Sequence, residues 1–221
     1  MLFRLNKQKL LKKYFYYYDL LTIAQEKIII PYFYKTMKTV SKVILGIDPG
    51  TVIMGYGVIE VIEKKPHAVV IGDVKMAKLA NHYVKLQHIF NRVTKLIDEY
   101  HPDELAIESP FMGKNAQVAI KLGRAQGAAI AAALQRDIPI FEYAPRKIKL
   151  AITGTGTASK EQVAALLQKI LKLSELPKNL DATDGLAAAL CHYYQTLNPI
   201  LGSGGSKNWS DFIKKNPGRV K

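Results

Sequence analysis

The chain has 221 residues, of which 32 are lysine or arginine and 18 are aspartate or glutamate, so its formal net charge is +14. This length suits one α/β domain with short extensions, and 48% hydrophobic with 23% charged residues excludes a disordered or fibrous protein. The single cysteine, Cys191, excludes a disulfide scaffold and a cysteine-based zinc cluster, and it fits a reducing cytoplasm. A pI of about 9.7 indicates a polyanionic partner, either nucleic acid or an acidic membrane surface.

Much of the positive charge lies at the two ends. Residues 1–36 hold seven basic and two acidic residues, and residues 201–221 hold five basic and one acidic residue. We interpret 1–36 as a basic N-terminal extension: a DNA-binding arm, a short amphipathic helix, or a disordered segment preceding the true start at Met37. Residues 201–221 contain the linker-like run GSGGS and predict a flexible basic tail. The folded domain is then expected at 37–200, with no signal peptide and no membrane-spanning stretch.

Three short strands are predicted at the start of this domain. The apolar run at 43–47 indicates a buried strand, and the turn residues at 48–50 close it. Residues 55–62 and 68–71 predict two more strands with short links, which favours an antiparallel meander. Apolar residues then recur at three- and four-residue spacing over 83–100, which predicts an amphipathic helix.

The second half of the domain alternates between strands and helices. Strands are predicted at 104–108 and 138–143, on either side of an alanine- and glycine-rich helix at 114–135. Two further helices are predicted at 159–172 and 181–197. This order predicts an α/β fold in which a mixed sheet is covered by helices.

Four acidic residues stand at the ends of predicted elements. Asp48 follows the first strand, Glu108 ends the fourth, and Asp181 and Asp184 share one face at the start of the last helix. Ligands of such sheets gather beyond strand ends, so these carboxylates could converge. Four converging carboxylates need a cation, and oxygen ligands select Mg²⁺ or Mn²⁺. A basic protein with a focal acidic cluster is typical of metal-dependent phosphodiester chemistry.

Each acid also has an ordinary structural alternative. Asp48 could fix a turn, Asp181 could cap a helix, and Glu108 could end a strand in solvent. The five histidines show no pair at ligand spacing, and we assign none of them to a site. The loop before the 159–172 helix lacks the spacing of a nucleotide-binding P-loop, so Ser159 is interpreted as a helix cap and Lys160 as free to meet a phosphate.

A series of segments in the domain resembles the RuvC family of Holliday-junction resolvases. The segments are ILGIDPG (44–50), GYGVI (55–59), AIE (106–108), FMGKN (111–115), LGRAQG (122–127), FEYAPR (141–146) and DATDGLA (181–187). They occur in the family's order and spacing over about 42–195.

The resemblance implies a ribonuclease-H-like fold with a five-stranded mixed sheet, three antiparallel strands followed by parallel strands, flanked by helices. It implies a homodimer, joined through the alanine-rich helix, that binds a four-way junction and nicks two opposing strands symmetrically. The nicks would leave 5′-phosphate and 3′-hydroxyl ends. The enzyme would act in the cytoplasm in homologous recombination and DNA repair, together with the RuvA–RuvB branch-migration complex.

The resemblance also implies roles for single residues. The four acids fall on the family's catalytic, metal-binding positions, with two Mg²⁺ ions per subunit and Mn²⁺ able to substitute. Phe111 falls on an aromatic residue that stacks on a base near the cut. Lys114, Lys149 and Lys160 fall on positions that contact DNA.

Two other functions remain open at this point. The turn GIDPGT at 46–51 resembles the phosphate-binding turn of actin-like ATPases, although such a protein would need a second phosphate loop and usually a second domain. A non-catalytic junction-binding protein of the same fold is the other alternative, and the presence of all four acids argues against it.

Overall fold

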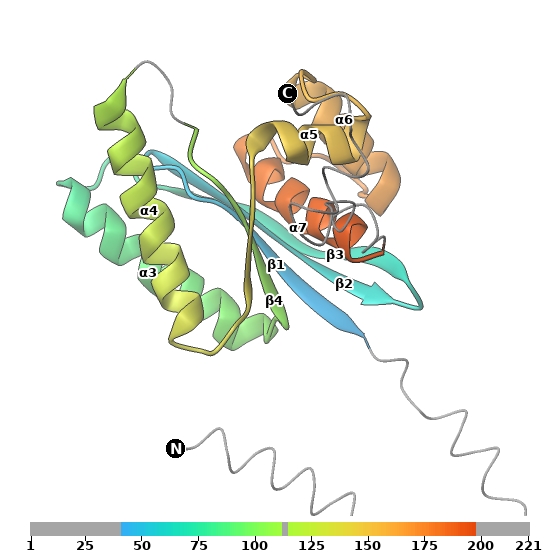
Figure 1. Ribbon diagram of the computed structural model, residues 1–221, viewed down its shortest axis with the longest axis horizontal. Coiled ribbons are helices and arrows are strands. Elements are labelled where there is room, and N and C mark those ends of the chain that lie inside the picture. The colour runs from blue at the N-terminus through green and yellow to red at the C-terminus, as the bar shows by residue number, and fades with distance from the viewer. Residues whose placement is uncertain (1–40, 112–114, 198–221) are drawn as a thin grey trace, which may run out of the picture. The chain divides into compact units, whose positions relative to one another are not determined.

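The computed structural model describes residues 41–111 and 115–197 (Figure 1). The predicted extension 1–36, the tail 201–221 and both domain boundaries lie outside the described residues and stay predictions. The elements are β1 (Lys42–Asp48), β2 (Ile53–Ile62), β3 (Lys65–Lys75), α3 (His82–Tyr100), β4 (Glu104–Glu108), α4 (Ala116–Leu134), β5 (Ile140–Tyr143), α5 (Pro145–Thr153), α6 (Lys160–Leu171) and α7 (Asp181–Leu197).

The strands form one five-stranded sheet in the order β3-β2-β1-β4-β5. The pairs β1–β2 and β2–β3 are antiparallel, whereas β1–β4 and β4–β5 are parallel. The fold prediction of a mixed sheet, antiparallel at one side and parallel at the other, is therefore confirmed.

Helices cover both faces of the sheet (Figure 1). Leu45 and Ile47 of β1 belong to a buried cluster with residues of α3 and α4, whereas Ile44 belongs to a second cluster with residues of α5, α6 and α7. Because β1 is buried on both faces, it reads as a nearly continuous apolar run rather than as an alternating one. No helix in the described ranges is long and apolar enough to cross a membrane.

One helix was missing from the sequence-based prediction. Helix α5 spans nine residues and buries only Ile148 and Ile152, so its apolar repeat is too short to be recognised by periodicity. Its boundaries did carry a signal, because Pro145 occupies the first turn and Gly154 ends the helix with a left-handed φ of 77°. The predicted cap at the next helix is confirmed, since Ser159 forms a capping box with Gln162.

Helix α7 lies unusually close to the middle of the sheet. A Cβ atom added to Gly46 of β1 would lie 2.0 Å from the carbonyl oxygen of Gly185, and one added to Gly55 of β2 would lie 2.1 Å from that of Asp181. The strands carry glycine at these points because no side chain fits between them and the helix backbone. The close approach brings the first turn of α7 directly over the sheet.

A hydrogen-bonded network of three side chains joins strands β4 and β5 to helix α7. Tyr143 donates a hydrogen bond to Nδ1 of His192 at 2.6 Å, and Nε2 of His192 donates to Glu104 at 2.5 Å. Burial lowers the pKa of His192, although the hydrogen bond to Glu104 opposes this effect. This network therefore runs from the last residue of β5, through His192 of α7, to the first residue of β4.

We predict that Gly46→Ala destabilises the protein by about 1–3 kcal/mol, because the new methyl group must displace the backbone of α7. The melting temperature should fall by about 2–4 °C for each kcal/mol in a chain of this size, which thermal unfolding followed by circular dichroism would measure. Gly123→Ala in α4 is the matched control, since nothing lies within 4 Å of its added Cβ. Equal melting temperatures for Gly46→Ala and the unmodified protein would contradict the close packing.

Candidate active site

Two of the four predicted acids stand at the same edge of the sheet. Asp48 is the last residue of β1 and Glu108 the last residue of β4. The two strands are parallel neighbours with Ile47 paired to Ile107, so their carboxyl ends meet at one edge. This register brings the Asp48 and Glu108 side chains into one pocket.

The other two acids arrive from α7. Asp181 and Asp184 lie in its first turn. The carbonyl of Asp181 lies over Gly55, and Gly55 pairs with Asp48 across the β1–β2 ladder. The start of the helix is thereby placed next to the end of β1, although Asp48 and Asp181 are far apart in the sequence.

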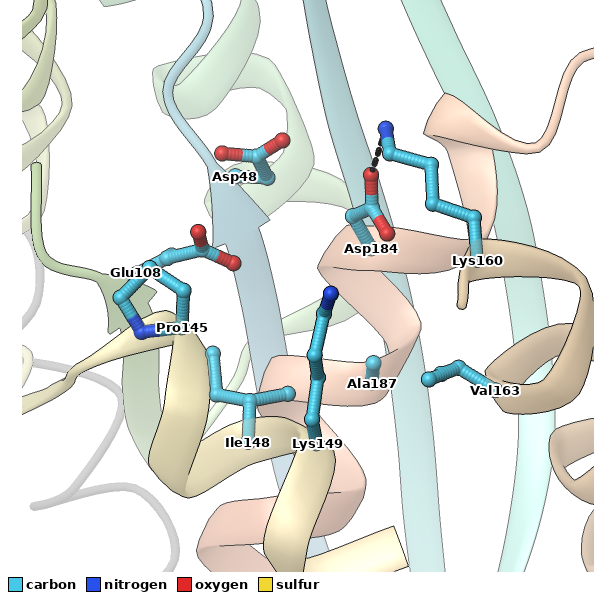
Figure 2. Close-up of a pocket in the computed structure, with 9 residues that line it drawn as sticks. All are labelled: Asp48, Glu108, Pro145, Ile148, Lys149, Lys160, Val163, Asp184 and Ala187. Carbon is cyan, nitrogen blue, oxygen red and sulfur yellow. Dashed lines mark hydrogen bonds and ion pairs between the residues drawn. The ribbon is translucent and has the colours of Figure 1, made fainter. Parts of the chain in front are cut away.

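A pocket of about 210 Å³ gathers these groups (Figure 2). Asp48, Glu108 and Asp184 line it together with Lys149 of α5 and Lys160 of α6. Its remaining lining residues are Pro145, Ile148, Val163 and Ala187. Helix α5, which the sequence-based prediction omitted, thus supplies one wall of the pocket.

Asp181 does not line this pocket and is joined to it through Lys160. The ammonium group of Lys160 contacts Oδ1 of Asp181 at 2.5 Å and Oδ2 of Asp184 at 2.6 Å. We expected Lys160 to be free to meet a phosphate, but in this structure it pairs with the two carboxylates. The reason is electrostatic, because an ammonium group within reach of two adjacent carboxylates lowers their mutual repulsion.

The carboxylates strongly affect one another. Burial, followed by the charge of Asp184, raises the pKa of Asp48 to about 6. Burial, followed by the charge of Asp48, raises the pKa of Glu108 to about 8. Burial also raises the pKa of Asp184, and Lys160 opposes this rise. Burial alone would lower the pKa of Lys160, but its bonds to the two aspartates raise it above its usual value.

In the described parts of the chain, no three carboxylate, histidine or cysteine side chains lie close enough to form a ready-made metal cluster. Repulsion between the buried carboxylates keeps them apart, and Lys160 pairs with two of the four candidate acids, Asp181 and Asp184. The donor set still fits a hard divalent cation, because it is entirely oxygen and because the carboxylates share a partly buried pocket that disfavours their charges.

The residues expected to contact DNA fall in different places. Lys149 and Lys160 line the main pocket. Phe111 lines an adjoining pocket of about 150 Å³ that shares Asp48 and Glu108, and it is 74% exposed. Lys114 lies outside the described residues. His192, to which we assigned no role, contacts Glu104 at the opposite end of β4 from Glu108.

Sequence reasoning overlooked one pair of residues beside the site. Asn179, just before α7, donates from Nδ2 to Oδ2 of Asp73 on β3 at 2.6 Å. Its Oδ1 accepts from the backbone N–H of Asp181 at 3.3 Å. An asparagine just before a predicted helix is a capping signal, but its partner 106 residues away in the sequence has no local signature.

Comparisons with known proteins agree with this geometry. The family model described as "Crossover junction endodeoxyribonuclease RuvC" matches residues 44–192. Crossover junction endodeoxyribonuclease RuvC of Porphyromonas gingivalis is 55% identical over 190 residues, covering 84% of this chain and 100% of that protein. The protein of the same name from Bacteroides fragilis is 59% identical over 182 residues, covering 81% of this chain and 96% of that protein.

Solved structures show the same relationship. RuvC of Thermus thermophilus, in complex with a Holliday junction substrate, superimposes with a TM-score of 0.65 at 33% identity. That match covers 71% of this chain and 96% of the Thermus chain. The family model spans the described sheet and helices, and the two relatives are more than half identical over at least 96% of their length, so the chain belongs to the RuvC family of crossover junction endodeoxyribonucleases.

Proposed function

We propose that this chain is a structure-selective endonuclease that resolves Holliday junctions in homologous recombination and DNA repair. Two symmetric nicks would leave 5′-phosphate and 3′-hydroxyl ends. The observation that carries the proposal is the pocket where Asp48, Glu108 and Asp184 converge with two lysines. Further support comes from the names of the relatives and from the Thermus RuvC that was solved with a Holliday junction substrate.

RuvC family nucleases are metal-dependent, and we propose Mg²⁺ as the ion, two per subunit, with Mn²⁺ able to substitute. Asp48, Glu108, Asp181 and Asp184 would hold the metal. When bound, the metal supplies an activated water and stabilises charge on the scissile phosphate. The carboxylates of this chain form a partly buried site, and burial together with mutual repulsion disfavours their ionised forms. A bound cation would offset this repulsion and favour the ionised forms.

The basic and aromatic side chains around the pocket are suited to binding the DNA backbone and bases. Lys149 lines the pocket beside the acids, where its ammonium can stabilise a phosphate oxygen as charge develops. Lys160 can do the same once a metal ion satisfies its two aspartates. The exposed ring of Phe111 borders Asp48 and Glu108, and stacking of a base on it would contribute about 1–3 kcal/mol.

Symmetric nicking requires two active sites, and we propose a homodimer formed through α4. The solvent-exposed residues of this helix that share one stripe are Ile120, Arg124, Gly127, Ala131 and Leu134. They repeat at alternating spacings of four and three, as on a helix that packs against another helix. The small residues at the centre of the stripe would allow the two helices to approach closely.

We also propose a cytoplasmic protein that cooperates with the RuvA–RuvB branch-migration complex, as the family relationship implies. The actin-like ATPase alternative is not favoured, because the family model extends over residues 44–192 rather than over a phosphate-binding turn alone. The non-catalytic alternative is not favoured either, since all four acids are present.

Asp48→Asn should abolish cleavage of a labelled four-way junction in Mg²⁺ while leaving junction binding unchanged, because the amide cannot supply the charge that holds the metal. Gel assays of nicking, and of binding in Ca²⁺, would measure the two effects. Asp137→Asn is the matched control, since this exposed residue has a φ of 55°, which asparagine tolerates. Normal nicking by Asp48→Asn would refute the assigned site.

Lys160→Gln should lower the melting temperature in chelator, because Asp181 and Asp184 lose their shared partner. It should also raise Mn²⁺ affinity on the order of tenfold, since a competing charge next to the ligands is removed. Titration calorimetry would measure the affinity, with Lys169→Gln in the last turn of the same helix as control. Unchanged affinity for Mn²⁺ would show that Lys160 does not compete for the carboxylates.

Glu108 should make the stability of the metal-free protein depend on pH. Its carboxyl titrates near 4.5 when unfolded and at about 8 when folded, so the folded state binds more protons between these values. The free energy of unfolding therefore falls as pH rises through this window. In chelator, Glu108→Gln should remove the part of this fall above about pH 6 and leave the part that the raised pKa of Asp48 causes at lower pH. The variant should then melt above the unmodified protein at about pH 8.5.

Thermal melts in chelator across this pH range would test the effect of Glu108. Glu175→Gln, which neutralises an exposed acid, is the control and should leave the pH profile unchanged. Identical pH profiles for Glu108→Gln and the unmodified protein would show that Glu108 is not buried as a protonated acid.

A further inference from the structure

The hydrogen bond between Asn179 and Asp73 joins the start of α7 to the edge of the sheet. Asn179 belongs to the turn that leads into α7, and Asp73 belongs to the edge strand β3. A single amide group joins them: its nitrogen donates to Asp73 and its oxygen accepts from the first N–H of α7, that of Asp181.

Strand register connects Asp73 to the active site. Asp73 pairs with Gly55 on β2, and Gly55 pairs with Asp48 on β1. The three residues therefore form one row across the sheet, with the candidate metal ligand Asp48 at one end. Asn179 fastens the start of α7 to the other end of the same row.

The start of α7 needs such a restraint because electrostatic forces from Asp48 and from Lys160 act on its two aspartates in different directions. Asp181 and Asp184 bear the same charge as Asp48 and are repelled by it, whereas Lys160 draws both toward α6. Asp181 and Asp184 are the partly exposed residues of this turn, whereas Ala182, Thr183 and the stretch from Gly185 to Tyr193 are buried. Loss of the Asn179 link should therefore shift the carboxylates of Asp181 and Asp184 and leave the packed helix in place.

We propose that Asn179 is a positioning residue for metal binding, acting through Asp73 to set the placement of Asp181 and Asp184 relative to Asp48. This inference rests on the proposed function, since it takes the two aspartates to be metal ligands. Residues that orient metal ligands commonly alter metal affinity about 10–100-fold when they are replaced.

The test compares Mn²⁺ affinity and thermal stability of full-length variants. Asn179→Ala should weaken Mn²⁺ binding about tenfold by titration calorimetry. Asn81→Ala is the matched control: Asn81 caps α3 through Val84 on the opposite face of the sheet, so its loss should lower the melting temperature without changing Mn²⁺ affinity. Both variants should melt at similar temperatures.

A second set of variants separates position from charge. Asn179→Asp sets two carboxylates against each other and should weaken Mn²⁺ binding, whereas added charge alone would strengthen it. In the double variant with Asp73→Asn, the amide at position 73 can donate to the carboxylate at position 179. The hydrogen bond is restored in the reverse direction, and the Mn²⁺ affinity should recover. This pair also decides the question if Asn179→Ala does not fold.

Two results would overturn the positioning role: Mn²⁺ affinity in Asn179→Ala equal to that of the unmodified protein, or failure of the double variant to recover the affinity lost in Asn179→Asp. Failure of the unmodified protein to nick four-way junctions would instead contradict the proposed function. The two failures are therefore distinguishable.

Discussion

The contact between the backbone of α7 and the strands β1 and β2 is the constraint on which the rest of the structure depends. Gly46 and Gly55 leave no side chain between strand and helix, so the helix carbonyls lie directly over the sheet. This contact buries the middle of α7 and sets its first turn beside the carboxyl end of β1. Asp48, Glu108 and Asp184 come from distant parts of the chain and can share one pocket only because this distance is so short.

The same closeness creates an electrostatic conflict. Burial and mutual repulsion raise the pKa values of Asp48, Glu108 and Asp184, so the folded chain disfavours the charged forms that would hold the proposed metal. Lys160 relieves part of the conflict by pairing with two of the acids. A site that destabilises its own charges is well suited to a divalent cation, because binding the ion removes the repulsion.

The sequence predicted most elements for identifiable reasons. Strand β1 was visible as an uninterrupted apolar run, and α3 as a long apolar repeat. Helix α5 was missed because nine residues with two buried positions produce no clear period. The candidate acids could be chosen because each ends or begins an element, and their chemistry depends on residue type alone. The partner of Lys160 could not be chosen in this way, because it depends on how α6 packs beside α7.

The sequence by itself determined the fold class, the oxygen-rich donor set and the family, since these depend on local patterns and ordered motifs. Only the tertiary structure decided which groups touch. The bond between Asn179 and Asp73 spans 106 residues and follows from the register of β2 with β3. The pairing of Lys160 with Asp181 and Asp184 follows from how closely α6 packs beside α7. Such contacts depend on distances between elements, and the order of residues along a chain does not specify those distances until the elements have packed.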